Sequence, residues 1–181
     1  MKIQSLRNKS VLFLAGYTLL VFSLSCKKVK DLFSFTITNE CNITINSASP
    51  VNIPFVVSTP DVTTNSNQQF QNNNTSANLV KDIRLQNLKL TITNPSSQTF
   101  AFLKTIHIYI STNASNEIEL ASMDNITAST TTLELNATQA KLDEYIKASS
   151  YNLRTEVVTK QILTQQVDIK VESRFKVTAN L

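Results

Sequence analysis

The chain has 181 residues, a formal net charge of +4, one histidine, no tryptophan and a single glycine, Gly16. Glycine makes up about 7% of an average protein, and Walker loops, dinucleotide-binding fingerprints and nucleophile elbows all require it. These sites are therefore excluded, and the single histidine excludes a histidine-cluster metal site.

The amino terminus has the layout of a secretory signal. A basic stretch with Lys2, Arg7 and Lys9 precedes an apolar run from Val11 to Leu24. A membrane-spanning helix needs about 20 predominantly apolar residues, and this run is shorter. We therefore expect residues 1–25 to be a signal peptide rather than a transmembrane helix.

The small residues that end this run resemble the cleavage site of bacterial lipoproteins. Ser25 stands directly before Cys26, and Ser23 occupies the place where leucine is usual, which makes the motif a relaxed lipobox. The resemblance covers residues 1–26 and implies that Cys26 carries the lipid and becomes the mature amino terminus. Because Ser23-Leu24-Ser25 also suits an ordinary signal peptidase, plain secretion stays open, as does an uncleaved anchor.

Residues 26–31 follow as the lipidated cysteine and its tether, with Lys27, Lys28 and Lys30. Each basic residue at the headgroups of an anionic membrane adds about 1 kcal/mol of attraction; a solvated tether is the other interpretation. The resemblance implies a lipid-anchored protein of the outer membrane, facing either the periplasm or the cell surface. The expected partner is therefore the membrane, through the lipid on Cys26.

The net positive charge belongs to the signal and the tether. From Asp31 onward the chain has 11 basic and 13 acidic residues. A body with this balance and no basic run lacks the electrostatic footprint of a phosphate-binding surface. Nucleic acid is therefore not an expected partner.

Residues 32–181 are enough for one domain with a single core. Apolar residues alternate over 33–45, with Asn39-Glu40 as a turn or a polar interruption. The next alternating segment, 51–57, contains Pro54, which lacks a ladder donor and so predicts an edge strand. The apolar positions of that segment are Val51, Ile53, Phe55 and Val57.

The rest of the body continues the same period of two. Over 83–92 the apolar phase changes at Gln86-Asn87, which predicts a β-bulge. Later strands are indicated by Ile106, Ile108 and Ile110, by Ile118 and Leu120, by Leu133 and Leu135, by Tyr151, Leu153, Thr155 and Val157, and by Val167, Ile169, Val171, Phe175 and Val177. The pattern predicts an all-β antiparallel β-sandwich, immunoglobulin-like or similar, of about eight or nine strands.

Two segments depart from the strand pattern. A short helix is expected over 138–148, with Thr138 as its cap and Asp143 paired with Lys147. Its apolar face comprises Leu142, Tyr145 and Ile146. Residues 61–76 are almost entirely polar and predict a long solvated loop or a partly disordered linker, with a recognition loop as the functional alternative. Turns without glycine must use Asn, Asp and Ser.

Candidate chemical groups are few. His107 is predicted on a polar strand face beside Tyr109, and Cys41 shares the phase of buried residues, which indicates a buried unpaired thiol. The carboxylate pairs are Glu117 with Glu119 and Asp143 with Glu144, interpreted as surface charge. We therefore expect no catalytic residue, no bound metal and no cofactor.

Two functions fit these observations. The first is a lipid-anchored, non-enzymatic interaction or structural protein with an envelope protein as its partner. The alternative is a carrier for a small apolar ligand held in a sandwich or barrel cavity. A hydrolase would need an open pocket that gathers Glu117, Glu119 or His107. The segment Leu90 to Phe100 resembles the strand–Asn-Pro pattern of sandwich domains in stress-related proteins.

Overall fold

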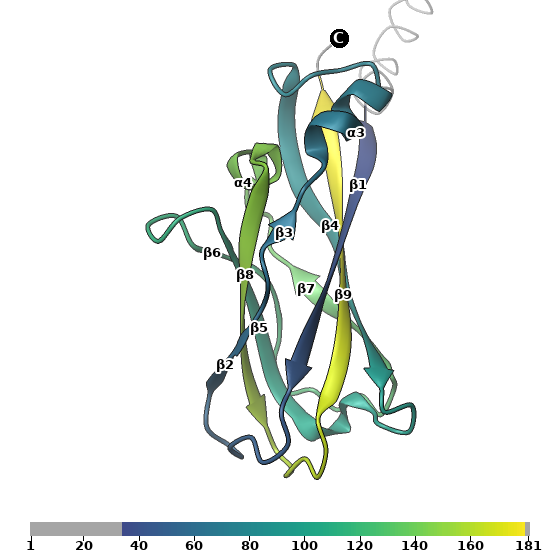
Figure 1. Cartoon of the computed structure of the whole chain (residues 1–181), viewed down its shortest axis with the longest axis vertical. Helices are drawn as coiled ribbons and strands as arrows, with labels where there is room; N and C mark the ends of the chain where they lie inside the picture. The colour runs from purple at the N-terminus through teal and green to yellow at the C-terminus, as the bar shows by residue number, and fades with distance from the viewer. Residues whose placement is uncertain (1–33, 180–181) are drawn as a thin grey trace, which may run out of the picture. The chain divides into compact units, whose positions relative to one another are not determined.

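The computed structural model describes residues 34–179. The predicted signal over 1–25 and Cys26 lie outside the described residues. Within the described range the chain forms an antiparallel β-sandwich of nine strands with two short α-helices (Figure 1). The predicted fold class is thus confirmed, with one helix more than expected.

The nine strands make two layers. One layer holds, in order, β1 (Ser34–Ile45), β9 (Val167–Ala179), β4 (Val80–Asn94) and β7 (Thr132–Ala137). The other holds β6 (Ile118–Met123), β5 (Leu103–Ser111), β8 (Ser150–Thr159) and β2 (Phe55–Ser58). Strand β3 (Val62–Thr63) pairs with β8 outside this order. The layers are joined through β7 and β6, so β1 and β2 are the two end strands.

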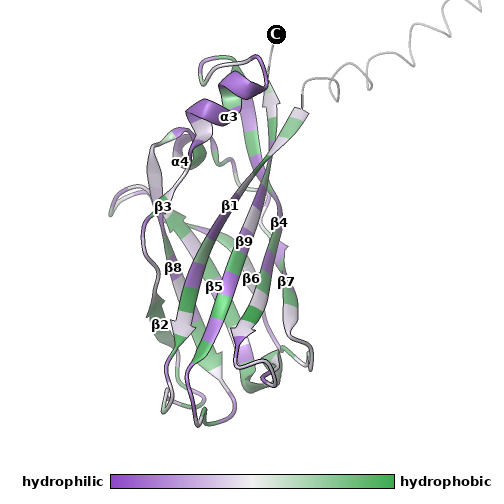
Figure 2. Cartoon of the chain, turned by 45° about the vertical axis from the view of Figure 1, so that its right-hand side comes forward, coloured by the Kyte–Doolittle hydropathy of each residue, from purple (hydrophilic) through white to green (hydrophobic). Residues whose placement is uncertain are grey.

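The alternating pattern explains the core. In β9, every second residue from Val167 to Val177 is buried, while Lys170, Glu172 and Arg174 lie on the outer face. The same striping runs along the other long strands (Figure 2). Because burying one Leu, Ile, Val or Phe side chain contributes about 1.5–3 kcal/mol, the two inner faces hold the sandwich together.

Two local predictions are confirmed. The register of β4 against β9 shifts between Leu85 and Asn87, so Gln86 is the extra residue of a bulge. The described residues with positive φ are Ala48 and four asparagines, Asn52, Asn65, Asn74 and Asn125. Asparagine therefore takes the left-handed positions that glycine would normally occupy.

The first strand has no turn at its centre. Strand β1 runs through Asn39 without a break, so the polar interruption is the correct alternative. Asn39 is buried because its amide donates a hydrogen bond to the hydroxyl of Tyr151, at 3.2 Å. A polar residue can thus occupy an inward position of a continuous strand when a hydrogen-bond partner lies across the sandwich.

The segment before β2 corrects the prediction for Ile53. That side chain is 59% exposed, and the strand begins only at Phe55. The reason is Asn52, whose φ of 58° turns the backbone and whose N–H donates to the carbonyl of Thr159. Strand β2 does lie at an edge, directly after Pro54, as expected.

Residues 61–76 do not form the predicted solvated loop. They contain β3 and the helix α3 (Ser66–Asn72). Phe70 is 1% exposed, and its ring meets Phe35 edge-on at a centroid distance of 6.3 Å. The ring of Phe70 thus packs this polar segment against β1. The helix was not predicted because one apolar residue cannot produce a helical period in the sequence.

The second helix is shorter than predicted. Helix α4 (Asp143–Lys147) begins five residues after the expected cap. Thr138 is not its cap, because the Thr138 hydroxyl donates to the carbonyl of Glu119 at 3.0 Å. The predicted pair of Asp143 and Lys147 is confirmed at 3.5 Å, and the predicted apolar face is buried.

Candidate functional site

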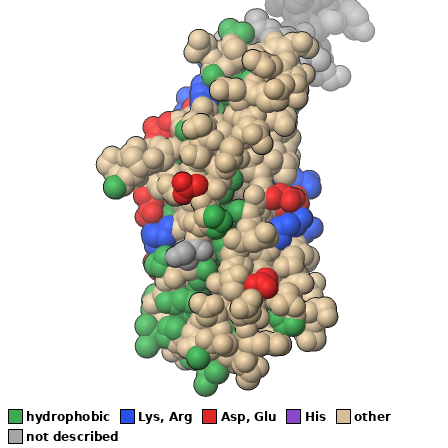
Figure 3. Space-filling model, viewed as in Figure 1, with side chains coloured by type: hydrophobic (Ala, Val, Ile, Leu, Met, Phe, Trp, Pro, Cys, Tyr) green, Lys and Arg blue, Asp and Glu red, His purple; other side chains and the backbone are tan. Residues whose placement is uncertain are grey.

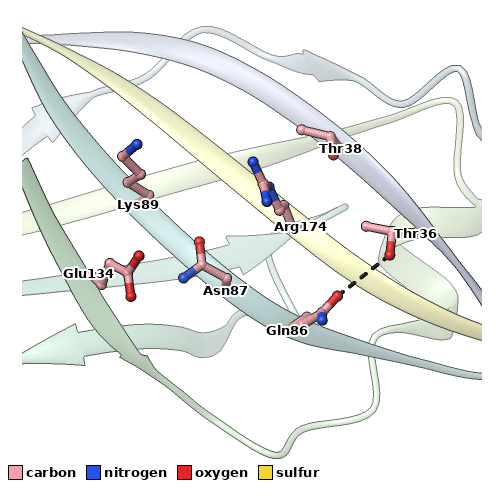
Figure 4. Close-up of a pocket in the computed structure, with 7 residues that line it drawn as sticks. All are labelled: Thr36, Thr38, Gln86, Asn87, Lys89, Glu134 and Arg174. Atoms are coloured by element: carbon pink, nitrogen blue, oxygen red, sulfur yellow. Dashed lines mark hydrogen bonds between the residues drawn. The ribbon is translucent and has the colours of Figure 1, made fainter.

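A polar groove lies on the outer face of the β1–β9–β4–β7 layer (Figure 4). Its volume is about 560 Å³. Seven residues line it: Thr36 and Thr38 from β1, Gln86, Asn87 and Lys89 from β4, Glu134 from β7 and Arg174 from β9. These side chains supply hydroxyl, amide, carboxylate and cationic groups, so the groove suits hydrogen bonding to a polar partner.

The bulge in β4 lies in the lining of this groove. Gln86 is the extra residue, and the Thr36 hydroxyl donates a hydrogen bond to its side-chain oxygen Oε1 at 3.5 Å, as the dashed line in Figure 4 shows. Asn87 stands directly opposite Arg174 in the register. Threonines of β1 and the cationic side chains of β4 and β9 thus line the same groove.

Opposite charges accompany one another around the groove. Arg174 binds Glu172 through Nε at 2.8 Å and Nη2 at 2.7 Å. The hydrogen bond from Arg174 holds the pKa of Glu172 below its usual value. Lys89 stands opposite both Glu134 and Glu172 in the two ladders. The groove therefore has charged groups of both signs and no strong field of one sign.

His107 lies on the outer face of the other layer, on β5, as predicted. Its Nε2 is 3.2 Å from an oxygen of Asp124, and its Nδ1 is 3.6 Å from an oxygen of Glu119. Its ring stacks beside Tyr109 at a centroid distance of 6.5 Å. Ser122 is its cross-strand neighbour on β6. Because carboxylates face both ring nitrogens, His107 is not oriented as a base toward that serine.

Arg154 organises the neighbouring carboxylates. It donates from Nε and Nη2 to Glu117, at 3.0 and 2.8 Å, and from Nη1 to Glu156 at 3.2 Å. Its guanidinium lies 3.9 Å from the ring centroid of Tyr109. The hydrogen bonds lower the pKa of Glu117 and raise that of Arg154. Glu117 thus remains ionised as the partner of an arginine.

The predicted carboxylate pairs do not act as pairs. Glu117 holds Arg154, whereas Glu119 faces His107. Asp143 accepts a hydrogen bond from the backbone N–H of Ile83 at 3.3 Å, and Glu144 accepts one from the Asn116 amide. Each carboxylate has its own structural partner, which agrees with their interpretation as surface charge.

Cys41 is half-buried on β1 and forms no disulfide within the described residues. Burial raises the pKa of its thiol to about 11. The side chain is therefore a neutral thiol at physiological pH, whereas reactive cysteines need a stabilised thiolate. Residues 34–179 also contain no group of three His, Cys, Asp or Glu side chains arranged to hold a metal ion.

Some residues of these surfaces were not identifiable in the sequence. Arg154 is one such residue. It is 47 positions from His107 in the sequence, and the register between β5 and β8 places it opposite Tyr109. Arg174 and Asn87 meet in the same way across β4 and β9. The only available signal was the bulge at Gln86-Asn87, which marks an irregularity but names no partner.

Comparisons with known proteins give only distant similarity. No family model and no curated protein matches the sequence. Among solved structures, a Desmodium yellow mottle tymovirus structure is 14% identical, with 82% of this chain and 83% of that chain covered and a TM-score of 0.32. The decameric BFDV capsid protein is 9% identical, with 82% and 99% covered and a TM-score of 0.37.

A carbohydrate-binding module of the β-sandwich superfamily is also similar, at 12% identity over 77% of this chain and 54% of that chain, with a TM-score of 0.28. These three similarities concern the sandwich architecture alone. At such TM-scores none of them bears on what this chain binds or does.

Proposed function

We propose that the protein is a lipid-anchored, non-enzymatic interaction protein of the outer membrane, with an envelope protein as its partner. The anchor rests on the signal layout of residues 1–25 and on Cys26. One acyl chain binds a membrane only marginally, whereas several chains hold a protein stably. Diacylglycerol on the thiol and an acyl chain on the new amine supply three.

One observation carries the non-enzymatic part of the proposal. The side chains with the greatest catalytic potential are held by partners: His107 lies between two carboxylates, and Glu117 binds Arg154. The polar groove of the opposite layer offers amides and hydroxyls, without a nucleophile beside a base. Both surfaces suit recognition better than bond cleavage.

The interior favours interaction over transport of an apolar ligand. Large side chains such as Phe100, Phe175 and Tyr151 are buried between the layers. The polar groove lies outside this core. Among the described residues, no helix has the length and apolar character to cross a membrane.

The two cysteines provide a matched test of the anchor. Cells that express wild type, Cys26→Ala and Cys41→Ala are labelled with radioactive palmitate, and their membranes are separated from the soluble fraction. We expect label and membrane association in wild type and Cys41→Ala, and loss of both in Cys26→Ala. A wild-type protein that takes up no label and is released in soluble form would refute the lipid anchor.

A further inference from the structure

The end strand β2 has an outer edge with two special properties. Among residues 34–179 it pairs with β8 alone, over Phe55–Ser58. In an antiparallel ladder, alternate residues turn their N–H and C=O groups away from the partner strand, so half of these residues present unpaired backbone groups. Val56 is also 54% exposed, and Ile53 just before the strand is 59% exposed. Apolar side chains gather at this end of the molecule (Figure 3).

A slot lies between this strand and the end of β1. Its volume is about 430 Å³. Polar residues near the end of β1 form one wall, and a mostly apolar segment around β2 forms the other. The lining residues are Asn42, Thr44, Asn46 and Ser49 on the first wall, and Phe55, Val56, Val57 and Pro60 on the second. The two end strands of the sheet thus border one slot, one wall polar and one apolar.

The protein's own amino terminus cannot cover this slot if the proposed anchor is correct. Ser34 begins β1, and the slot residues from Asn42 to Asn46 lie about 26–40 Å further along an extended strand. The residues between Cys26 and Ser34 span at most about 29 Å, so they reach only the near end of the slot at full extension, and the proposed lipid keeps Cys26 in the membrane. The slot therefore needs an occupant other than the tether, and this step rests on the proposed function.

A second copy of the chain fits this edge poorly. Strand β2 has four residues, enclosed by Pro54 and Pro60. Two such strands side by side bury far less than the roughly 1,200–2,000 Å² of a stable protein interface. Pairing of β2 with the β2 strand of a second copy also leaves the slot between β1 and β2 unfilled.

We infer that the slot binds an extended segment of a partner protein, which adds to β2 as a further strand. An added strand pairs with the outward N–H and C=O groups, and its alternate side chains point to the two faces of the sheet. Apolar residues would lie beside Phe55 and Val57 on the inner face, while the residues between them would lie on the outer face beside Val56 and near the exposed Asn42 and Thr44. The partner segment is therefore about four or five residues long, with apolar and polar residues in alternation.

The probe is a random ten-residue peptide library, selected against the full-length protein in detergent. We expect enrichment of peptides with alternating apolar and polar residues. Their affinity should fall at least tenfold in Val56→Lys and stay unchanged in Leu79→Lys. Leu79 is the matched control because it is 42% exposed just before β4, at the end where Val80 pairs with Ala179.

Hydrogen exchange separates strand addition from simple adhesion. Binding by strand addition slows exchange of amides in Phe55–Ser58, whereas adhesion to exposed side chains leaves these amides unchanged. Equal binding to both lysine variants, or selected peptides without alternation, would overturn the inference. A wild-type dimer that Val56→Lys dissociates would assign the edge to a second copy instead.

The binding experiment and the lipid experiment fail separately. Peptide binding is also measured with Cys26→Ala, which lacks the proposed lipid site. Loss of palmitate label with intact peptide binding refutes the anchor and retains the slot as a peptide site. Normal labelling without peptide binding refutes the slot and retains the anchor.

Discussion

The two halves of β1 meet very different surroundings. Near its start, Phe35 packs on Phe70 of α3, and Asn39 donates a hydrogen bond to Tyr151 of β8. Near its end, Asn42 and Thr44 line a slot whose other wall is β2. The first half of β1 is thus held by side-chain contacts with α3 and β8, whereas the second half borders the slot.

We expect the first half of β1 to contribute to stability and the second half, which borders the slot, to contribute to binding. An edge covered by a helix is protected against further strand pairing, and near Phe35 the ring of Phe70 from α3 packs beside β1. Beside β2 the structure provides a short edge with an exposed valine instead. We therefore expect substitutions in the first region to change the free energy of unfolding, and substitutions in the second to change binding.

The largest expected effect is at Phe70. Phe70→Ala removes a side chain that is 1% exposed and leaves a cavity against Phe35. Such truncations cost about 3–5 kcal/mol. Urea unfolding followed by circular dichroism measures this loss. Leu79→Ala is the control, since that side chain is 42% exposed, and an equal loss in both variants would show that α3 does not close the sandwich.

A smaller effect is expected at Tyr151. Tyr151→Phe removes the hydroxyl and leaves the buried amide of Asn39 without this partner. An unsatisfied buried polar group costs about 1–3 kcal/mol. The same unfolding experiment measures the change. If Tyr151→Phe is as stable as wild type, the hydrogen bond does not help to close the first half of β1.

The outer ion pairs should contribute less and depend on pH. Arg154→Ala removes the partner of Glu117, and both side chains are about one-third exposed, so the loss at pH 7 is below about 1 kcal/mol. The pKa of Glu117 is lowered from 4.5 in the folded protein. Its contribution is therefore complete above pH 4.5 and disappears as the pH falls through the folded-state value.

Unfolding curves between pH 7 and pH 3 test this dependence. The difference in stability between wild type and Arg154→Ala should shrink below pH 4.5. Lys81→Ala, at an exposed position of β4, is the control for loss of a surface cation. A difference that stays constant over this range would mean that packing on Tyr109, rather than the ion pair, accounts for the effect of Arg154.

The smallest effect on stability is expected at Val56. Val56→Lys changes an exposed side chain on the edge strand, and surface substitutions of this kind stay within about 0.5 kcal/mol. Thermal unfolding should give the wild-type midpoint. A strongly destabilised variant would show that β2 supports the core, and the contrast between the two halves of β1 would then fail.

Most of the fold could be predicted because each long strand buries one face. Val167 to Val177 show this clearly, since period two fixes the inward side chains without knowledge of their neighbours. The predictions failed where one residue decides the local structure. Phe70 is the one apolar side chain buried from α3, and Asn52 turns the chain where Ile53 is exposed. Neither residue produces a periodic signal.

The surfaces were less predictable than the core. The sequence placed His107 beside Tyr109 on an outer face, and the structure agrees. It did not bring Arg154 to Tyr109, because that contact depends on the register between β5 and β8. The slot depends on two strands at opposite ends of the sheet order, a relation that only the closed sandwich creates.

The most direct test of the proposed anchored protein is the intact mass of the mature chain, purified from membranes. We predict a chain that begins at Cys26 and carries the added mass of one diacylglyceryl group and one further acyl chain. A chain without acyl mass, or one that begins at any other residue, would contradict the lipid anchor on which the proposed function rests.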